Sequence, residues 1–280
     1  MRWIDVNSVD FPAAVEASKG VCVIPIGCVE RHGTHMPLGC DTIACAEYAR
    51  RAAEIASVCV FPEMYFGEKS GAGEFPGTII FPTQLIWAIL EQSCNEIARN
   101  GFKKIVLFNG HGGNIAMLNA FARYMLQKKP CYQVFVYGER MAHLPSILAH
   151  IEKYPYLTEE DIAIMQDYVD KKKTDGHGGF LETGALYDVC PELIDLDKFG
   201  EVSGESIHLF DHIEKKGIYS GFTWMANQPN SLDCTYHAGL NARIAKAMGQ
   251  WKTETYADAF RTLRDETVTE EYHKQWLEKQ

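Results

Sequence analysis

Short, uninterrupted apolar runs that alternate with helical patterns constrain the fold of this chain most strongly. The runs Val21 to Ile26 (VCVIPI) and Ile105 to Phe108 (IVLF) are apolar throughout, which is typical of strands buried on both faces of a parallel sheet. Two further strands are predicted at Val58 to Phe61 and Gln133 to Tyr137. Because helical segments separate these runs, we expect an α/β fold of βαβ units, a three-layer αβα arrangement around a mostly parallel sheet.

Helices are expected between and after these strands. The predicted ranges are 42–56, 83–99, 114–127, 159–172, 180–189, 237–263 and 267–279. Asp41 and Thr42 are candidate N-caps of the first helix. Thr158 is a candidate N-cap of the fourth, and the basic run Lys171 to Lys173 suits its C-terminus. No linker or internal repeat interrupts the pattern, so we expect residues 1–280 to form a single domain.

Composition narrows the class of protein. The chain has 37 Asp and Glu against 27 Lys and Arg, a formal net charge of −10, so nucleic acid or an anionic membrane surface is not expected as a partner. The first residues lack the apolar core of a signal peptide, and no apolar stretch approaches the roughly 18 residues that span a bilayer. We therefore expect a cytoplasmic protein. Its nine cysteines include no CxxC pair and are expected to be reduced thiols.

The first polar constellation lies just past the carboxyl end of the first strand, where ligand sites of open α/β sheets belong. Glu30, His32 and Asp41 are natural metal ligands, and Cys28 and Cys40 flank them. Carboxylate and imidazole together suit zinc, manganese or iron(II), and an Asp with two oxygens can bridge two metals. A polar loop in which Asp41 only caps the helix is the alternative interpretation.

The second constellation is the turn NGHGGN at 109–114, directly after the IVLF strand. His111 is a candidate ligand, and the amides of Gly112 and Gly113 stand at a helix N-terminus, where they can hold a developing oxyanion. A phosphate-binding loop is an alternative, although no Lys-Ser/Thr pair follows the glycines. A plain strand-to-helix turn also remains open.

The third constellation is the segment HGGFLET, which begins at His177. Glu182 lies early in a predicted helix, where a carboxylate suits the helix dipole without any further role. His177 stands in a glycine loop, and a proton shuttle and a surface histidine fit it about equally.

Three other residues have structural interpretations, and a fourth has none. Trp224 and Tyr219 are expected in the core or an interface, with a pocket wall as the alternative. His35 is expected to form hydrogen bonds within its loop, and Asp175 has no assigned role.

Together, these segments resemble the creatininase (creatinine amidohydrolase) family. The matching pieces are VERHGTHMPLGCD, GEFPGTI, NGHGGN and HGGFLETG, and their order and spacing cover the range from about 20 to 195. The resemblance implies an αβα fold with two divalent metal ions (Zn, Mn or Fe), often in a homo-oligomer such as a hexamer. It also implies hydrolysis of cyclic amides, formamides or peptide bonds.

The resemblance also implies roles for individual residues. It assigns five metal ligands: Glu30, His32, Asp41, His111 and Glu182. Glu30 and His32 would ligate different metals, with Asp41 as the bridge. His177 would be the catalytic proton shuttle, and the segment from Phe75 to Thr78 would line the substrate side.

The chain departs from the family pattern at several positions. Creatininase proper has a metal-binding Glu where this chain has Gly113, so creatinine is not expected as the substrate, and Glu182 is expected to supply the missing carboxylate. Three residues stand where the family commonly has Gln, Pro and Ser: Arg31, Thr34 and Gly184. The range 140–176 is expected to be variable and to shape the pocket.

We therefore expect a binuclear-metal-dependent hydrolase in which a metal-bound hydroxide attacks a carbonyl. The first interpretation is cleavage of the C–N bond of a cyclic amide or a related small molecule. The alternative is a C–C bond hydrolase that opens a cyclic diketone derived from a cyclitol such as inositol. Two other classes remain open: a non-catalytic metal-binding scaffold, and a nucleotide-binding regulator built on the NGHGGN turn.

Overall fold

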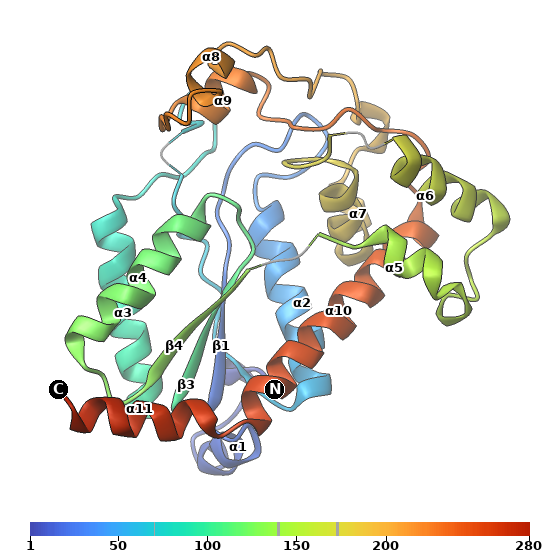
Figure 1. The fold of residues 1–280 in the computed structure, drawn as a ribbon. Coiled ribbons are helices and arrows are strands. Elements are labelled where there is room, and N and C mark those ends of the chain that lie inside the picture. Colours follow the sequence, from blue (N-terminus) through green and yellow to red (C-terminus); the bar gives the residue numbers. More distant parts are fainter. Residues whose placement is uncertain (70, 139–140, 172–173) are drawn as a thin grey trace.

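The four strands of the sheet are parallel and follow the order β2-β1-β3-β4 (Figure 1). They are β1 (Val21–Ile26), β2 (Cys59–Val60), β3 (Lys104–Asn109) and β4 (Gln133–Gly138). The computed structural model describes residues 1–69, 71–138, 141–171 and 174–280. The predicted strand order along the chain is confirmed, although β2 is shorter than expected and β3 is longer.

The register of the central strands brings two polar turns to one edge of the sheet. Strand β1 pairs with β3 from Val21 opposite Lys104 to Ile26 opposite Asn109. The two strands therefore end level with each other, and the segments that follow Ile26 and Asn109 leave the sheet side by side. Parallel strands impose this coincidence, because their carboxyl ends meet at the same edge.

Helices cover both faces of the sheet, so the predicted three-layer α/β architecture is confirmed (Figure 1). Side chains alternate along each strand. Val21, Val23 and Phe108 pack with α2 (Cys40–Ala56), α7 (Phe180–Val189) and α10 (Ala242–Asp265). Cys22, Ile24 and Leu107 pack on the opposite face against α3 (Thr83–Arg99) and α4 (Asn114–Lys128).

A third apolar cluster lies beside the sheet and includes α5 (Leu144–Ala149) and α6 (Glu159–Lys171). Ile244 and Met248 of α10 belong to this cluster, whereas Tyr256 and Phe260 of the same helix belong to the sheet-facing core. One helix therefore ties the two clusters together. This continuity supports the single-domain interpretation, which stays a prediction.

Two helix starts differ from the prediction. Helix α2 begins at Cys40 with Gly39 as N-cap, so the expectation that Asp41 or Thr42 caps it is wrong, and the Asp41 side chain points elsewhere. Helix α10 begins at 242 rather than 237, because the Asn241 side chain caps it by accepting hydrogen bonds from the amides of Arg243 and Ile244.

Helix α6 begins with a capping box. The Thr158 hydroxyl accepts a hydrogen bond from the Asp161 amide at 3.2 Å, and the Asp161 carboxylate accepts one from the Thr158 amide at 2.9 Å. This confirms Thr158 as the cap. The basic run predicted at the other end includes Lys172 and Lys173, which lie outside the described residues.

The predicted C-terminal helix is confirmed as α11 (Val268–Glu278). Several short helices were not predicted. The missed helices are α1 (Phe11–Ala17), α5, α8 (Asp211–Glu214), α9 (Thr223–Asn227) and the 3-10 turns η1 (Trp3–Asp5), η2 (Ile151–Lys153), η3 (Pro191–Leu193) and η4 (Leu196–Lys198). Most have fewer than two turns, too few for a helical period to be visible in the sequence.

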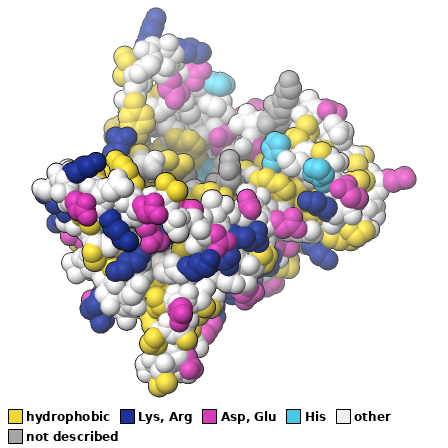
Figure 2. Space-filling model, turned by 60° about the horizontal axis from the view of Figure 1, so that its bottom comes forward, with side chains coloured by type: hydrophobic (Ala, Val, Ile, Leu, Met, Phe, Trp, Pro, Cys, Tyr) yellow, Lys and Arg dark blue, Asp and Glu magenta, His cyan; other side chains and the backbone are white. Residues whose placement is uncertain are grey.

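The surface carries both signs of charge. Figure 2 shows acidic and basic side chains interspersed over one face of the molecule. Within the described ranges, no helix is long and apolar enough to cross a bilayer.

Candidate metal centre

Buried acids and imidazoles converge at the edge of the sheet where β1 and β3 end. Glu30 and His32 lie in the loop after β1, Asp41 lies in the first turn of α2, and His111 lies in the turn after β3. Their exposed fractions are 0%, 0%, 2% and 5%. Such burial of ionisable groups is unfavourable unless they compensate one another or bind a cation.

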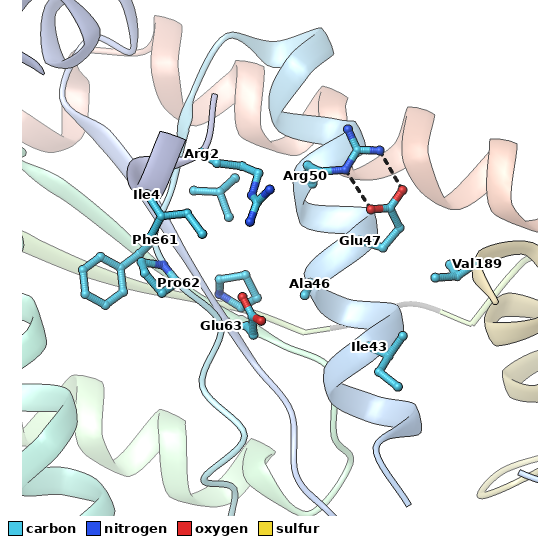
Figure 3. A pocket seen from close by; sticks show the side chains of 12 residues that line it. Arg2, Ile4, Ile43, Ala46, Glu47, Arg50, Phe61, Pro62, Glu63 and Val189 are labelled. Carbon is cyan, nitrogen blue, oxygen red and sulfur yellow. Dashed lines mark hydrogen bonds and ion pairs between the residues drawn. The ribbon is translucent and has the colours of Figure 1, made fainter. Parts of the chain in front are cut away.

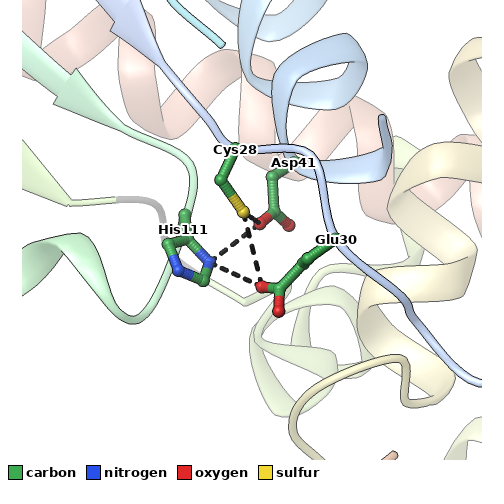
Figure 4. A group of neighbouring side chains, drawn as sticks. All are labelled: Cys28, Glu30, Asp41 and His111. Atoms are coloured by element: carbon green, nitrogen blue, oxygen red, sulfur yellow. Dashed lines mark hydrogen bonds and ion pairs between the residues drawn. The ribbon is translucent and has the colours of Figure 1, made fainter. Parts of the chain in front are cut away.

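We call the first part of the centre the His111 half, formed by Glu30, Asp41 and His111 with Cys28 beside them (Figure 4). The His111 Nδ1 lies 2.9 Å from Asp41 Oδ2 and 3.0 Å from Glu30 Oε1. The Cys28 Sγ lies 3.1 Å from the same Asp41 oxygen and 3.4 Å from the same Glu30 oxygen. These donor atoms surround one common point.

The second part, the His32 half, is formed by His32, Asp41 and Glu182, with Cys40 within reach. The His32 Nε2 lies 3.0 Å from Asp41 Oδ1 and 3.8 Å from Glu182 Oε2. Asp41 therefore directs one carboxylate oxygen at each imidazole. From the sequence, Glu182 was expected to supply the carboxylate that Gly113 lacks beside His111. In the structure, Glu182 instead belongs to the half that contains His32.

Backbone carbonyls orient both imidazoles. The His32 Nδ1 lies 3.2 Å from the Glu30 carbonyl, and the His111 Nε2 lies 3.0 Å from the Glu68 carbonyl. A carbonyl oxygen can only accept, so these nitrogens donate. In a neutral ring the other nitrogen is then an acceptor that faces a carboxylate oxygen, and two acceptors in contact need a proton or a cation between them.

The pKa shifts within the cluster also indicate that positive charge is needed between the carboxylates and the imidazoles. Burial alone would raise the pKa of Glu30 and of Asp41, but His111 and His32 hold both well below their ordinary values. Burial alone would lower the pKa of the two imidazoles. Asp41 and Glu182 instead raise the pKa of His32 to about 10, and Asp41 and Glu30 raise the pKa of His111 to about 10. The carboxylates thus attract positive charge strongly, and mixed carboxylate and imidazole donors fit zinc, manganese or iron(II).

His177 lies against the centre. Its ring stacks on His32 with centroids 4.1 Å apart, and its Nε2 donates to the Arg31 carbonyl at 2.8 Å. The other nitrogen, Nδ1, lies 3.9 Å from Glu30 Oε1. Burial and the neighbouring His32 lower the pKa of His177 to about 3, so the ring is neutral at pH 7, with the Nδ1 lone pair toward the cluster.

Two residues lie at the rim: Lys69, which sequence reasoning missed, and Trp224, for which a pocket wall was the alternative interpretation. The Lys69 ammonium contacts Glu30 Oε2 and lies 5.0 Å from the centre of the Trp224 ring. Trp224 also meets the His177 ring edge to face at 5.0 Å, so it belongs to the site rather than to the core. Tyr219 is 89% exposed and is not a core residue. Nothing in the sequence singled out Lys69.

Two further residues hold α7, which carries Glu182. Asp175 accepts hydrogen bonds from the amides of Phe180 and Leu181 at 2.6 and 3.1 Å. The His35 Nε2 lies 2.9 Å from the Thr183 hydroxyl. His35 was expected to form hydrogen bonds within its own loop, but it contacts Thr183 of α7 instead. Asp175, left without a role by the sequence, fixes the start of the helix.

The segments predicted for substrate adjoin the centre. Ile79 donates to the Val29 carbonyl at 3.0 Å, and the Arg31 guanidinium lies 4.5 Å from the Phe75 ring centre, so the stretch from Phe75 to Thr78 runs beside the Glu30 loop. In the other turn, a Cβ at Gly113 would lie 2.4 Å from His111 Nε2. Only glycine fits beside this imidazole.

A separate surface hollow lies between the N-terminal residues and α2 (Figure 3). Its walls include Arg2, Glu47 and Arg50, and Figure 3 shows Arg50 paired with Glu47. None of the residues predicted for the site lines it, and it adds nothing to the chemistry of the metal centre.

Comparison with known proteins identifies the class. The chain belongs to the creatinine amidohydrolase (creatininase) family, whose model matches residues 5–267. The resemblance read from the sequence is thereby confirmed, and so is the class of metal-dependent hydrolase.

Individual relatives are distant. The chain is 26% identical to the creatinine amidohydrolase of Pseudomonas putida over 196 residues, which cover 68% of this chain and 72% of that protein. It is 28% identical to the mycofactocin precursor peptide peptidase of Mycolicibacterium smegmatis over 185 residues, 59% of this chain and 73% of the relative. The solved structure called "Creatininase Mn" superposes with a TM-score of 0.73 at 20% identity, covering 95% and 99% of the two chains.

Replacing Asp175 tests how α7 is held. In Asp175→Ala the amides of Phe180 and Leu181 lose their acceptor, and we expect a loss of about 1–2 kcal/mol in the free energy of unfolding, measured by urea denaturation. Asp175→Asn keeps one oxygen and should lose less. Asp170→Ala, at an exposed position of α6, is the control. An Asp175→Ala protein as stable as the control would contradict this role.

Proposed function

We propose that this protein hydrolyses the C–N bond of a cyclic amide or a related small molecule with two divalent metal ions. One observation carries the proposal: Asp41 directs its two oxygens at two imidazoles, each of which is tied through its other nitrogen to a backbone carbonyl. Such a carboxylate is a natural bridge between two cations. Family membership supports the hydrolytic chemistry.

The residues divide between the two cations. Glu30 and His111 would hold one, His32 and Glu182 the other, and Asp41 both. Two such cations would lower the pKa of a water from about 15.7 towards about 7 and would polarise the carbonyl to be attacked. The backbone and side-chain contacts described above hold the donors in place before any substrate arrives.

His177 is the group that moves the proton. It is neutral, its Nε2 is anchored on the Arg31 carbonyl, and its Nδ1 faces Glu30. Nδ1 can therefore accept a proton from the attacking water and pass it to the departing nitrogen. Gly112 and Gly113 directly precede α4, and Gly113 is its N-cap residue. Backbone N–H groups at a helix N-terminus have no partner within the helix. We therefore assign the amides of Gly112 and Gly113 to the developing oxyanion.

Creatinine itself is not the proposed substrate. Gly113 offers no side chain beside His111, and Arg31 projects toward Phe75 at the rim. A cyclic diketone derived from a cyclitol is the second candidate, because the same donors would stabilise an enolate leaving group, but no contact among the described residues favours it over an amide. The solution assembly that we propose is a homo-oligomer, as the family resemblance implies, and a cytoplasmic location remains the expectation from composition.

A substrate panel tests the function. Metal-loaded protein is offered lactams, cyclic imides, formamides and short peptides alongside cyclic diketones, with chelator-treated protein as the control. We expect ring opening of an amide, detected as a new amine and carboxylate, only with metal. Opening of the diketones alone would replace the proposal with C–C hydrolysis. No reaction with any compound by metal-loaded protein would contradict the C–N assignment.

Metal content should respond differently to two carboxylates. Asp41→Ala removes the residue shared by both halves, so bound metal should fall from about two ions per chain to nearly none. Glu182→Ala opens only the His32 half and should leave about one ion. Elemental analysis after dialysis measures both, with the exposed Glu192→Ala as control. Equal losses in the two variants would show that Asp41 is not a bridge.

His177→Ala should separate catalysis from metal binding. The variant keeps all five proposed ligands, so its metal content should match the wild type. Its turnover should fall by roughly 10²–10⁴, the usual contribution of a general acid or base. His143→Ala, at an exposed site, is the control. Wild-type turnover in His177→Ala would rule out the shuttle, and loss of metal would instead make His177 a ligand.

A further inference from the structure

The Cys28 thiol sits among the donors of the His111 half. Its side chain is buried at 1% exposure, and its sulfur contacts Asp41 Oδ2 and Glu30 Oε1, the two oxygens that also contact His111 Nδ1. Figure 4 shows the four side chains directed toward a common point from the loop after β1, from α2 and from the turn after β3.

The spacing of these atoms matches a tetrahedral metal site. With ligand bonds of about 2.0–2.3 Å, as for zinc with nitrogen, oxygen and sulfur, tetrahedral ligand atoms lie about 3.3–3.7 Å from one another. Four of the six pairs among the donor atoms of the His111 half measure 2.9, 3.0, 3.1 and 3.4 Å, and all four atoms lie within 4.8 Å of one another. For those four pairs, a cation at the centre requires outward shifts of only a few tenths of an ångström.

Other buried thiols of the chain have a different environment. The Cys45 sulfur donates to the Phe108 carbonyl at 3.4 Å, and the Cys234 sulfur donates to the Tyr236 carbonyl at 3.0 Å. Cys234 also interacts with one carboxylate, that of Asp175. Cys28 instead contacts two carboxylates that share a histidine, and these donors are close enough together to hold one metal ion.

We propose that Cys28 is a thiolate ligand of the cation held by Glu30, Asp41 and His111. The sulfur–metal bond forms as the thiol proton leaves to solvent, and no oxidation state changes, so no oxidant is needed. A soft sulfur donor makes the His111 half favour Zn²⁺, Co²⁺ or Fe²⁺ over Mn²⁺ and Mg²⁺. This inference rests on the proposed metal centre and specifies which cation its first half selects.

Cobalt substitution gives a direct signature. Wild-type protein loaded with Co²⁺ should show the near-ultraviolet charge-transfer absorption of a cobalt–thiolate bond, and Cys28→Ser should lose it. Cys45→Ser, a buried thiol of α2 that donates to the Phe108 carbonyl, and Cys40→Ser, whose thiol adjoins the His32 half, should keep it. A band that disappears only in Cys40→Ser, or no band in the wild type, overturns the proposal.

A second measurement does not depend on the folding of a variant. X-ray absorption of the zinc-loaded wild type should show a sulfur neighbour at about 2.3 Å. In Cys28→Ser, the affinity for Zn²⁺ should fall roughly tenfold or more, while that for Mn²⁺ changes little. Two bound zinc ions without a sulfur neighbour would overturn the inference and leave the proposed hydrolase intact. Failure of the wild type to bind metal would overturn both.

Discussion

The level ending of β1 and β3 is the constraint on which the rest of the structure depends. Register pairs Ile26 with Asn109, so the loop that carries Glu30 and His32 and the turn that carries His111 leave the sheet at one edge. Helix α2 then starts beside them and supplies Asp41 from its first turn. A shift of register by one residue would flip the faces of the strands and separate the donors.

Burial gives this edge its chemistry. Carboxylates and imidazoles held away from water stabilise each other only if positive charge balances the acids. The backbone carbonyls of Glu30 and Glu68 orient the two rings, and Lys69 neutralises part of the charge from the rim. The centre is therefore organised before a ligand enters, which is what hydrolysis by a fixed set of groups requires.

Much of this arrangement was visible in the sequence, because strands, glycine turns and metal-binding side chains each leave a local signal. The sheet, the three layers and the convergence of Glu30, Asp41 and His111 follow from such signals. Local signals left Asp41 open between a helix cap and a bridging ligand, since N-cap preference and metal binding favour the same residue type. Lys69, Trp224 and Asp175 act through contacts between distant segments, and no local pattern records them. The partition of Glu182 to the His32 half likewise depends on how α7 packs against α10.

Chain order gives the two halves of the centre different histories. All donors of the His111 half lie between residues 28 and 111, in the part of the chain that is synthesised first. The His32 half also needs Glu182 of α7, whose start is held by the later contacts of Asp175. A nascent chain therefore contains all residues of the His111 half well before those of the His32 half, because proteins fold progressively from the N-terminus during synthesis. The donors of the His111 half can therefore come together before the helix that completes the His32 half has been synthesised.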